Sequence, residues 1–253
     1  MDFILDKKAP FFGNKYKTHP FNDAGEDWPI LWKAAIEEIE ANQVGGQLLK
    51  EIRKAERSVT VRRANDGENM TWTESPNPRQ LHYCALNDVE ELNRVFSEAS
   101  KNGARVREIV KGSGAKVTWK STNSTDVSVS EVDLSPIAGW KLLIELEKYN
   151  CLKTGGGMNC FVRWDPKSEL ATDKGAKPEF KWQTRPPWIA LAHELIHAWR
   201  YVTGRMIFPE SENISDERLT TGLAPYPWGK YTENGVRYYA GQVMRTSYGT
   251  MHK

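Results

Sequence analysis

The stretch from Trp188 to Gly204 constrains the fold of this 253-residue chain more than any other. It follows Pro186 and Pro187, which suit a helix start, and it ends at Gly204, a residue typical of the turn after a helix. On a helical wheel one face collects apolar side chains, namely Trp188, Leu191, Ala192, Leu195, Trp199 and Val202. The opposite face carries His193, Glu194 and His197. The stretch therefore predicts a helix with one side for a core and one side for chemistry.

The pattern His193-Glu194-x-x-His197 points to a metal site. Imidazoles four residues apart in a helix can bind one zinc ion, and the carboxylate beside the first of them can act on an attacking water. The alternative is a solvated helix face with two surface histidines. The motif lies in an apolar helix with start and stop signals at its ends, which favours the metal site over a solvated surface helix. We predict that His193 and His197 bind one catalytic Zn²⁺ and that Glu194 is the general base.

A catalytic zinc normally has three protein ligands and one open position. The continuation that would place a third His after a Gly is absent, because Arg200 and Thr203 stand at those positions. His252 lies near the end of the chain and is a poor candidate. A carboxylate on a following helix remains, and Glu217 lies 20 residues after His197. We predict Glu217 as the third ligand; the alternatives are Glu210, Glu212 and Glu233.

Asp216 precedes the predicted third ligand and would suit a hydrogen bond to an imidazole N–H. The competing interpretation is that Asp216 and Glu217 are only helix N-terminal charges, which the helix dipole favours.

The amino-acid composition limits the classes of protein to which this chain can belong. Hydrophobic residues make up 39% and charged residues 27%, which is typical of a globular protein. The 35 basic and 33 acidic residues leave a net charge of +2, which calls for neither nucleic acid nor an anionic membrane as a partner. No apolar run is long enough to cross a membrane, and no classical signal peptide opens the chain. An odd number of cysteines (Cys84, Cys151 and Cys160) predicts free thiols, and we expect a monomer.

Helical and strand patterns alternate irregularly, which predicts an α+β fold with a small mixed sheet packed on the helix of residues 188–204. We expect residues 1–26 to be irregular, an edge strand at 58–62, a loop at 65–80 and a surface excursion at 166–185. The expected helices are 28–40 with Asp27 as its cap, 47–55 after Gly45-Gly46, one from Asn87 or Asp88 to 103, and 137–149. The remaining expected strands are 116–120, 126–132 and 158–164, with turns at Asn123 and at Thr154–Gly157. We divide the chain into an N-terminal helical segment, 1–45, and a domain that carries the predicted zinc site, 46–253.

The motifs carry a family resemblance. The HELIH sequence at 193–197, followed by Asp216-Glu-Arg-Leu-Thr-Thr-Gly222, resembles the gluzincins, including the thermolysin-like enzymes and clostridial neurotoxin light chains. That resemblance implies a His-His-Glu zinc site with Glu217 as its carboxylate. The segments 232–237 and 245–248 resemble the NleD-like family of type III secreted effector metallopeptidases. The resemblance spans about 47–248 and is specific from Ala192 onward.

The resemblance implies further roles. In the clostridial light chains an R-x-x-Y pattern places Arg and Tyr over the scissile carbonyl, and Arg245 and Tyr248 match it. Extra donors there would stabilise the negative charge that develops during amide hydrolysis. The implied protein is an effector secreted without a classical signal peptide, and it acts in the host cytoplasm. Its implied partner is a polypeptide substrate, a host signalling protein, with MAP kinases as one candidate class. Residues 1–45 are candidates for a secretion signal.

Three functions compete. The first is a zinc endopeptidase in which His193, His197 and Glu217 hold the ion and Glu194 moves the proton. The second is a catalytically silent effector that binds a host protein and uses zinc only for its fold, for which four protein ligands would be expected. The third is a zinc hydrolase acting on a small amide, which would need a closed pocket in place of a long groove.

Overall fold

The computed structural model describes residues 4–6, 27–83, 89–120, 127–134, 136–171, 177–208, 213–226 and 229–248. Its strands are β1 (Ile4–Asp6), β2 (Val59–Arg63), β3 (Met70–Trp72), β4 (Lys116–Trp119), β5 (Val129–Asp133) and β6 (Cys160–Trp164). Its helices are α1 (Trp28–Ala41), α2 (Gln43–Lys54), α3 (Pro78–Leu81), α4 (Val89–Lys101), α5 (Val106–Ser113), α6 (Pro136–Glu147), α7 (Pro187–Thr203), α8 (Asn213–Thr221) and α9 (Glu233–Tyr239). A 3₁₀ turn, η1 (Lys181–Gln183), precedes α7.

The main sheet is small and mixed. Its strand order is β1-β2-β6-β3, with β1, β2 and β6 parallel and β3 antiparallel to β6. Alternate side chains of the two central strands, Val59 and Val61 on β2 and Cys160 and Val162 on β6, point into one buried core. The predicted α+β class and the mixed sheet are confirmed.

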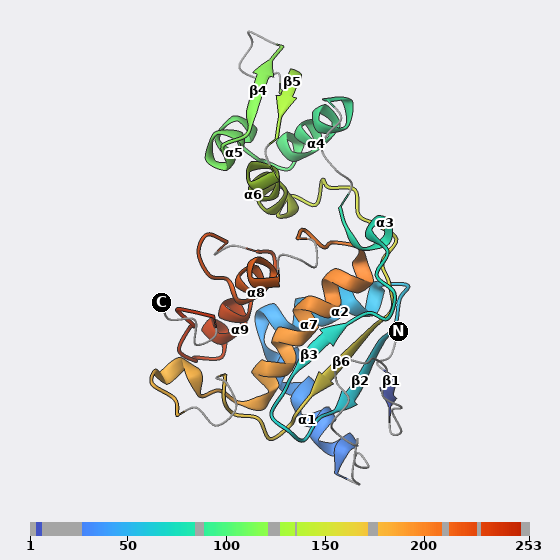
Figure 1. Ribbon diagram of the computed structural model, residues 1–253, viewed down its shortest axis with the longest axis vertical. Helices are drawn as coiled ribbons and strands as arrows, with labels where there is room; N and C mark the ends of the chain where they lie inside the picture. The colour runs from blue at the N-terminus through green and yellow to red at the C-terminus, as the bar shows by residue number, and fades with distance from the viewer. Residues whose placement is uncertain are drawn as a thin grey trace.

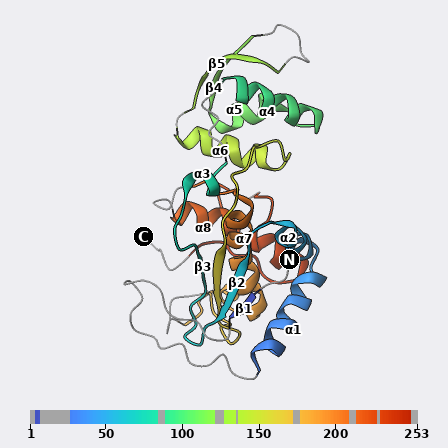
Figure 2. The ribbon, with the colours of Figure 1, turned by 90° about the vertical axis from the view of Figure 1, so that its right-hand side faces the viewer.

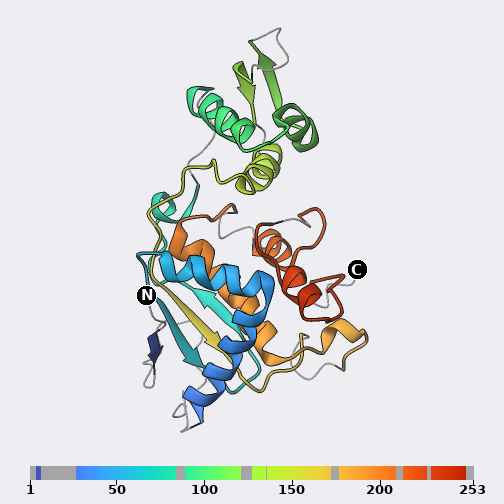
Figure 3. The ribbon, with the colours of Figure 1, turned by 180° about the vertical axis from the view of Figure 1, so that it is seen from behind.

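Helices α1, α2 and α7 cover one face of this sheet (Figure 3). Three tryptophans join the sheet to α1: the Trp28 and Trp164 rings lie 5.7 Å apart between centroids, and Trp32 packs edge-on against Trp164 at 6.4 Å. Helix α7 runs through this core, and its residues from Ile189 to Arg200 are all buried. The sheet and the two N-terminal helices therefore fix α7 in place.

A second unit stands beside this core, at the top of Figure 1. It consists of α4, α5, the antiparallel β4–β5 hairpin and α6, all inserted between β3 and β6 in the chain. Figure 2 shows the same separation from the side. Its own core contains Phe96, Val110 and Leu142, and it extends to Phe208 after α7 and Leu219 on α8. The inserted unit therefore packs against the segments that follow α7.

The end of α7 explains the glycines at 154–157. Gly204 ends the helix with φ of 64°, as the sequence indicates. A Cβ on Gly157 would lie 2.0 Å from the carbonyl oxygen of Val202, and one on Gly155 would lie 2.2 Å from that of Gln80. The backbone here passes too close to α7 and α3 for any side chain, so these glycines serve packing.

One predicted helix start is wrong, and one predicted cap contact is missing although helix α1 begins at Trp28 as predicted. Asp27 forms no cap hydrogen bond, because its carboxylate pairs with Arg63 at 2.5 Å. Helix α2 begins at Gln43, four residues before the predicted start. The side chain of Asn42 caps it by accepting hydrogen bonds from the N–H groups of Val44 and Gly45. The glycine pair therefore lies inside the helix, where a Cβ on Gly45 would lie 2.5 Å from the carbonyl of Ile39.

The predicted strand layout also needs correction. The strand expected at an edge is β2, which pairs with β6 on one side and β1 on the other. The segment expected to be a loop, 65–80, contains β3 and the start of α3. Strand β1 lies in the stretch expected to be irregular. Short strands such as these depend on partners that are distant in sequence, so local composition did not reveal them.

Several predictions lie outside the described residues: Cys84, the Asn87 or Asp88 cap, the turn at Asn123, Glu210, Glu212 and His252. The division of the chain at residue 45 stays a prediction; α1, which precedes it, packs in the same core as α7. Cys151 and Cys160 are buried and free. None of the helices in the described ranges is long and apolar enough to cross a membrane.

Candidate metal centre

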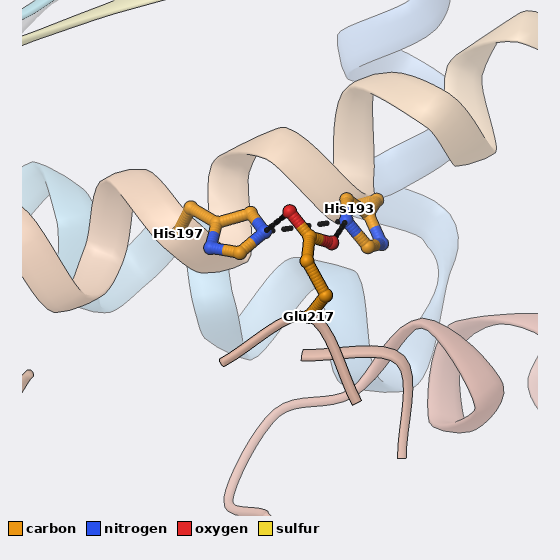
Figure 4. A group of neighbouring side chains, drawn as sticks. All are labelled: His193, His197 and Glu217. Atoms are coloured by element: carbon orange, nitrogen blue, oxygen red, sulfur yellow. Dashed lines mark hydrogen bonds and ion pairs between the residues drawn. The ribbon is translucent and has the colours of Figure 1, made fainter. Parts of the chain in front are cut away.

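Three side chains from α7 and α8 converge (Figure 4). His193 Nε2 lies 3.0 Å from one carboxylate oxygen of Glu217, and His197 Nε2 lies 3.4 Å from the other. The two Nε2 atoms are 3.2 Å apart. Figure 4 shows Glu217 reaching from the neighbouring helix to a position between the two imidazoles. The two imidazoles are almost fully buried, and the Glu217 side chain is 26% exposed.

The spacing of these atoms fits a zinc ion. In a tetrahedral site with bonds of about 2.0–2.1 Å, neighbouring ligand atoms lie about 3.3–3.4 Å apart. The observed separations of 3.0, 3.2 and 3.4 Å bracket that value. Two imidazole nitrogens and one carboxylate oxygen are also the donor types of catalytic zinc sites. Among the described residues this is the only His, Cys, Asp and Glu cluster with metal-ligand spacing.

Carboxylates hold the far nitrogens of both imidazoles. His193 Nδ1 lies 2.8 Å from Glu233 Oε2, and His197 Nδ1 lies 2.9 Å from Asp216 Oδ2. A proton on each Nδ1 leaves each Nε2 free to accept a metal. Asp216 makes the contact that the sequence led us to expect. Glu233, considered in the sequence as an alternative ligand, lies instead on the Nδ1 side.

Glu233 is held by two arginines. Arg237 donates from Nε to Oε1 at 2.7 Å, and Arg245 donates from Nη1 to Oε2 at 3.1 Å. Burial opposes the ionisation of Glu233, but Arg245 and His193 outweigh it, so the pKa of Glu233 is well below its ordinary value. A charged Glu233 can therefore orient the His193 ring.

Glu194 faces a cavity that His193 also lines. Thr71 on β3 donates its hydroxyl to Glu194 Oε2 at 2.8 Å and to the Glu194 carbonyl at 2.9 Å. Burial raises the pKa of Glu194, although the neighbouring His193 and His197 act in the opposite direction. A buried carboxyl with a raised pKa suits proton transfer near neutral pH.

The C-terminal segment brings Arg245 and Tyr248 to the same place. The Tyr248 ring stacks on that of His193, with centroids 6.5 Å apart and planes 19° apart. The Arg245 guanidinium lies over the Tyr248 ring at 4.9 Å and over Trp182 at 5.2 Å. Burial, followed by the charge of Glu217, raises the pKa of Tyr248, so its phenol keeps its proton. The structure thus brings together the predicted ligands and the predicted residues Glu194, Arg245 and Tyr248.

The cavity has a volume of about 630 Å³. The segment before β3, the segment after β6 and the site residues His193, Glu194, Arg245 and Tyr248 line it. Arg185, just before α7, also lines it. The predicted surface excursion at 166–185 therefore contributes to the walls of this cavity.

Three site residues escaped the sequence analysis: Thr71, Arg185 and Arg237. Thr71 lies in a segment that looked like a loop, and nothing in its neighbourhood signals the contact with Glu194. Arg237 could have been found, because it follows Glu233 by four residues, a spacing that pairs charges along a helix. Arg185 is an isolated arginine before a Pro-Pro pair, which by itself indicates nothing.

Comparison with protein families gives a match over nearly the whole chain. The model of the Peptidase M91 family, described as effector protein, matches residues 23–248. Comparisons with curated proteins and with solved structures gave no match.

Proposed function

Because this chain belongs to the Peptidase M91 family of effector proteins, we propose that it is a zinc-dependent endopeptidase of the gluzincin type, close to the NleD-like effectors. In this proposal His193, His197 and Glu217 hold one Zn²⁺. One observation carries it: three metal-ligand atoms converge beside a buried glutamate that faces a cavity. When bound, the ion supplies Lewis acidity to the substrate carbonyl and to the attacking water.

The protein's own residues would move the proton. Glu194 accepts a proton from the attacking water and delivers it to the leaving amine. The hydrogen bond from Thr71 to Oε2 holds the carboxylate in one orientation, which supports this role. Asp216 and Glu233 keep the imidazole rings in place through their Nδ1 atoms.

Tyr248 and Arg245 would act on the developing negative charge. A protonated phenol beside His193 can donate a hydrogen bond to the carbonyl oxygen as it becomes negative. Arg245 lines the same cavity, but its Nη1 is bound to Glu233. That bond supports a combined role, in which Arg245 fixes Glu233 and adds positive charge to the site.

The substrate would be a polypeptide, specifically a host signalling protein, with MAP kinases as one class to test. The effector description of the family supports action inside a host cell. The protein would act as a monomer. A structural zinc would need four protein ligands, and the cluster found in the described residues offers three, which favours catalysis.

The test is a mass-spectrometric search for new protein N-termini in eukaryotic lysate. We compare the wild-type protein with Glu194→Gln, which keeps the size of the side chain and an acceptor for Thr71. We expect new termini that require Glu194 and vanish with a zinc chelator, with cleavage by the variant lowered about 10²–10⁴-fold. Glu169→Gln, which removes an exposed carboxylate from the same cavity, is the matched control and should cleave normally.

If wild type and Glu194→Gln yield the same termini while both bind zinc, the endopeptidase proposal is wrong. The silent host-binding effector would then be the better explanation. Cleavage only of small amides would point to the third function.

A further inference from the structure

One buried cation of the cavity has no counterion among the residues that the structure describes. Arg185 lies two residues before α7 and lines the cavity together with His193 and Glu194. It is 9% exposed. A charge this deeply buried is ordinarily paired, so an unpaired one calls for an explanation.

The bonds of Arg185 are to backbone atoms. Its Nη1 donates to the carbonyl of Leu170 at 2.7 Å, and its own N–H donates to the carbonyl of Glu169 at 2.7 Å. Its Nε is buried and has no partner. Within the described ranges no carboxylate forms an ion pair with Arg185. Arg237 and Arg245, in contrast, both bind Glu233.

The acids around Arg185 are already committed. Glu233 binds two arginines and His193, and Glu194 accepts a hydrogen bond from Thr71. Burial, the largest influence, lowers the pKa of Arg185 to about 10, which still leaves the guanidinium charged at neutral pH. The cavity therefore contains a positive charge with which no carboxylate in the described part of the chain forms an ion pair.

The acids on the other wall do not offset it. Asp66 and Glu68 both pair with Arg163. Asp165 accepts hydrogen bonds from the N–H groups of Gly67 and Lys167. These three carboxylates have partners within the protein. Glu169, a further acid that lines the cavity, is exposed to solvent and forms no ion pair with Arg185 in the described residues, so a ligand can supply the negative charge.

We propose that Arg185 is a specificity-determining residue that binds an anionic side chain of the substrate, carboxylate or phosphomonoester, close to the scissile bond. The proposal rests on the peptidase function above. A guanidinium is suited to this role because its planar donors match carboxylate and phosphate oxygens. The shared cavity with Glu194 and His193 places the anion within a few residues of the bond that is cut.

The test uses a synthetic peptide mixture with randomised positions, including aspartate, glutamate, phosphoserine and their neutral counterparts asparagine, glutamine and serine. Cleavage by the zinc-loaded protein gives the preference at each position around the cut. We expect at least about a tenfold preference for an anionic residue at one position. The aspartate, glutamate and phosphoserine arms show which anion is bound.

Variants assign the preference to a side chain. In Arg185→Gln, which keeps a donor for the Leu170 carbonyl, the preference should fall to about twofold or less, while cleavage of neutral peptides is retained. Arg185→Met tests the same loss if the first variant folds poorly, and Arg185→Lys should keep part of the preference. Lys167→Gln, an exposed cation on the same cavity, is the matched control and should cleave like wild type.

A binding measurement separates this inference from the proposed function. The same mixture is incubated with Glu194→Ala and with Glu194→Ala/Arg185→Gln, and retained peptides are identified by mass spectrometry. Enrichment of anionic residues that needs Arg185, without cleavage by wild type, keeps the anion-binding role of Arg185 and rejects the peptidase. Cleavage without an anionic preference, or a preference that survives Arg185→Gln or disappears in Lys167→Gln, overturns the inference.

Discussion

Helix α7 buries charge at two places, three residues apart. At His193 and His197 the partner is Glu217 on α8. At Arg200 the partner is Glu147 on α6, in the inserted unit, and both side chains are completely buried. Arg200 Nη1 and Nη2 lie 3.0 and 3.4 Å from the two oxygens of Glu147, and Tyr83 donates its hydroxyl to Oε1 at 2.8 Å.

The two places differ in how hydrogen-bond donors and acceptors are paired. Around Glu147, donors from Arg200 and Tyr83 face acceptors, so the charges cancel within the protein. Around Glu217, two imidazole nitrogens and a carboxylate face one another. When both imidazoles are neutral and donate their Nδ1–H groups to Glu233 and Asp216, all three facing groups are acceptors. A cation completes that arrangement. Burial of charge alone therefore does not mark a functional site, whereas convergent acceptors do.

The largest expected effect on stability comes from breaking the buried ion pair between Arg200 and Glu147. Glu147→Gln leaves Arg200 as an uncompensated buried cation, so we expect the free energy of unfolding to fall by about 3–5 kcal/mol. Urea denaturation followed by circular dichroism measures it. The double variant Glu147→Leu/Arg200→Met removes both charges and should recover most of the loss. A cost below about 1 kcal/mol for Glu147→Gln would show that the pair is not structural.

The next largest effect is expected when zinc binds the cluster of His193, His197 and Glu217. Zinc at about a thousand times its Kd should stabilise the metal-free protein by about 4 kcal/mol, because the folded state alone presents the converged ligands. A rise in the thermal midpoint on adding zinc to the chelator-treated protein measures this. Glu217→Gln should lose most of the response.

A variant that weakens zinc binding only in part gives a second test of the same site. Asp216→Ala removes the acceptor at His197 Nδ1 and should weaken zinc binding about 10–100-fold in competition with a chromophoric chelator. Equal responses from wild type and Glu217→Gln would mean that the convergence does not bind zinc.

The smallest effect concerns Glu51, which contacts α7 near its C-terminal end. Its carboxylate accepts hydrogen bonds from Trp199 Nε1 at 2.9 Å and from Lys230 Nζ at 2.7 Å. Burial opposes its ionisation, but Lys230 outweighs burial and lowers the pKa of Glu51. A lowered pKa gives stability that is present above the ordinary pKa of glutamate and is lost as pH falls through the folded value.

We therefore expect Glu51→Gln to cost at most about 1 kcal/mol at pH 7, since the pair is partly exposed, and nothing at acid pH below the folded pKa. Urea denaturation at several pH values checks this. Glu38→Gln, an exposed residue of α1, is the control and should match wild type throughout. A loss for Glu51→Gln that is independent of pH would assign it to packing.

The sequence by itself determined α7 and its chemistry. The apolar stripe, the prolines before it and Gly204 after it all act within the helix, and the spacing of His193 and His197 follows from helix geometry alone. The α+β class followed from the order of helix and strand patterns. The family match over residues 23–248 agrees with the peptidase reading of these motifs.

Only the tertiary structure decided what surrounds that helix. Whether β2 is central depends on β1, and the contact of Thr71 with Glu194 depends on β3 pairing with β6. The two arginines that bind Glu233 and the cavity residue Arg185 are likewise brought together from separate segments. Short-range patterns report backbone preference and burial, whereas charge pairing depends on which distant segments meet in space.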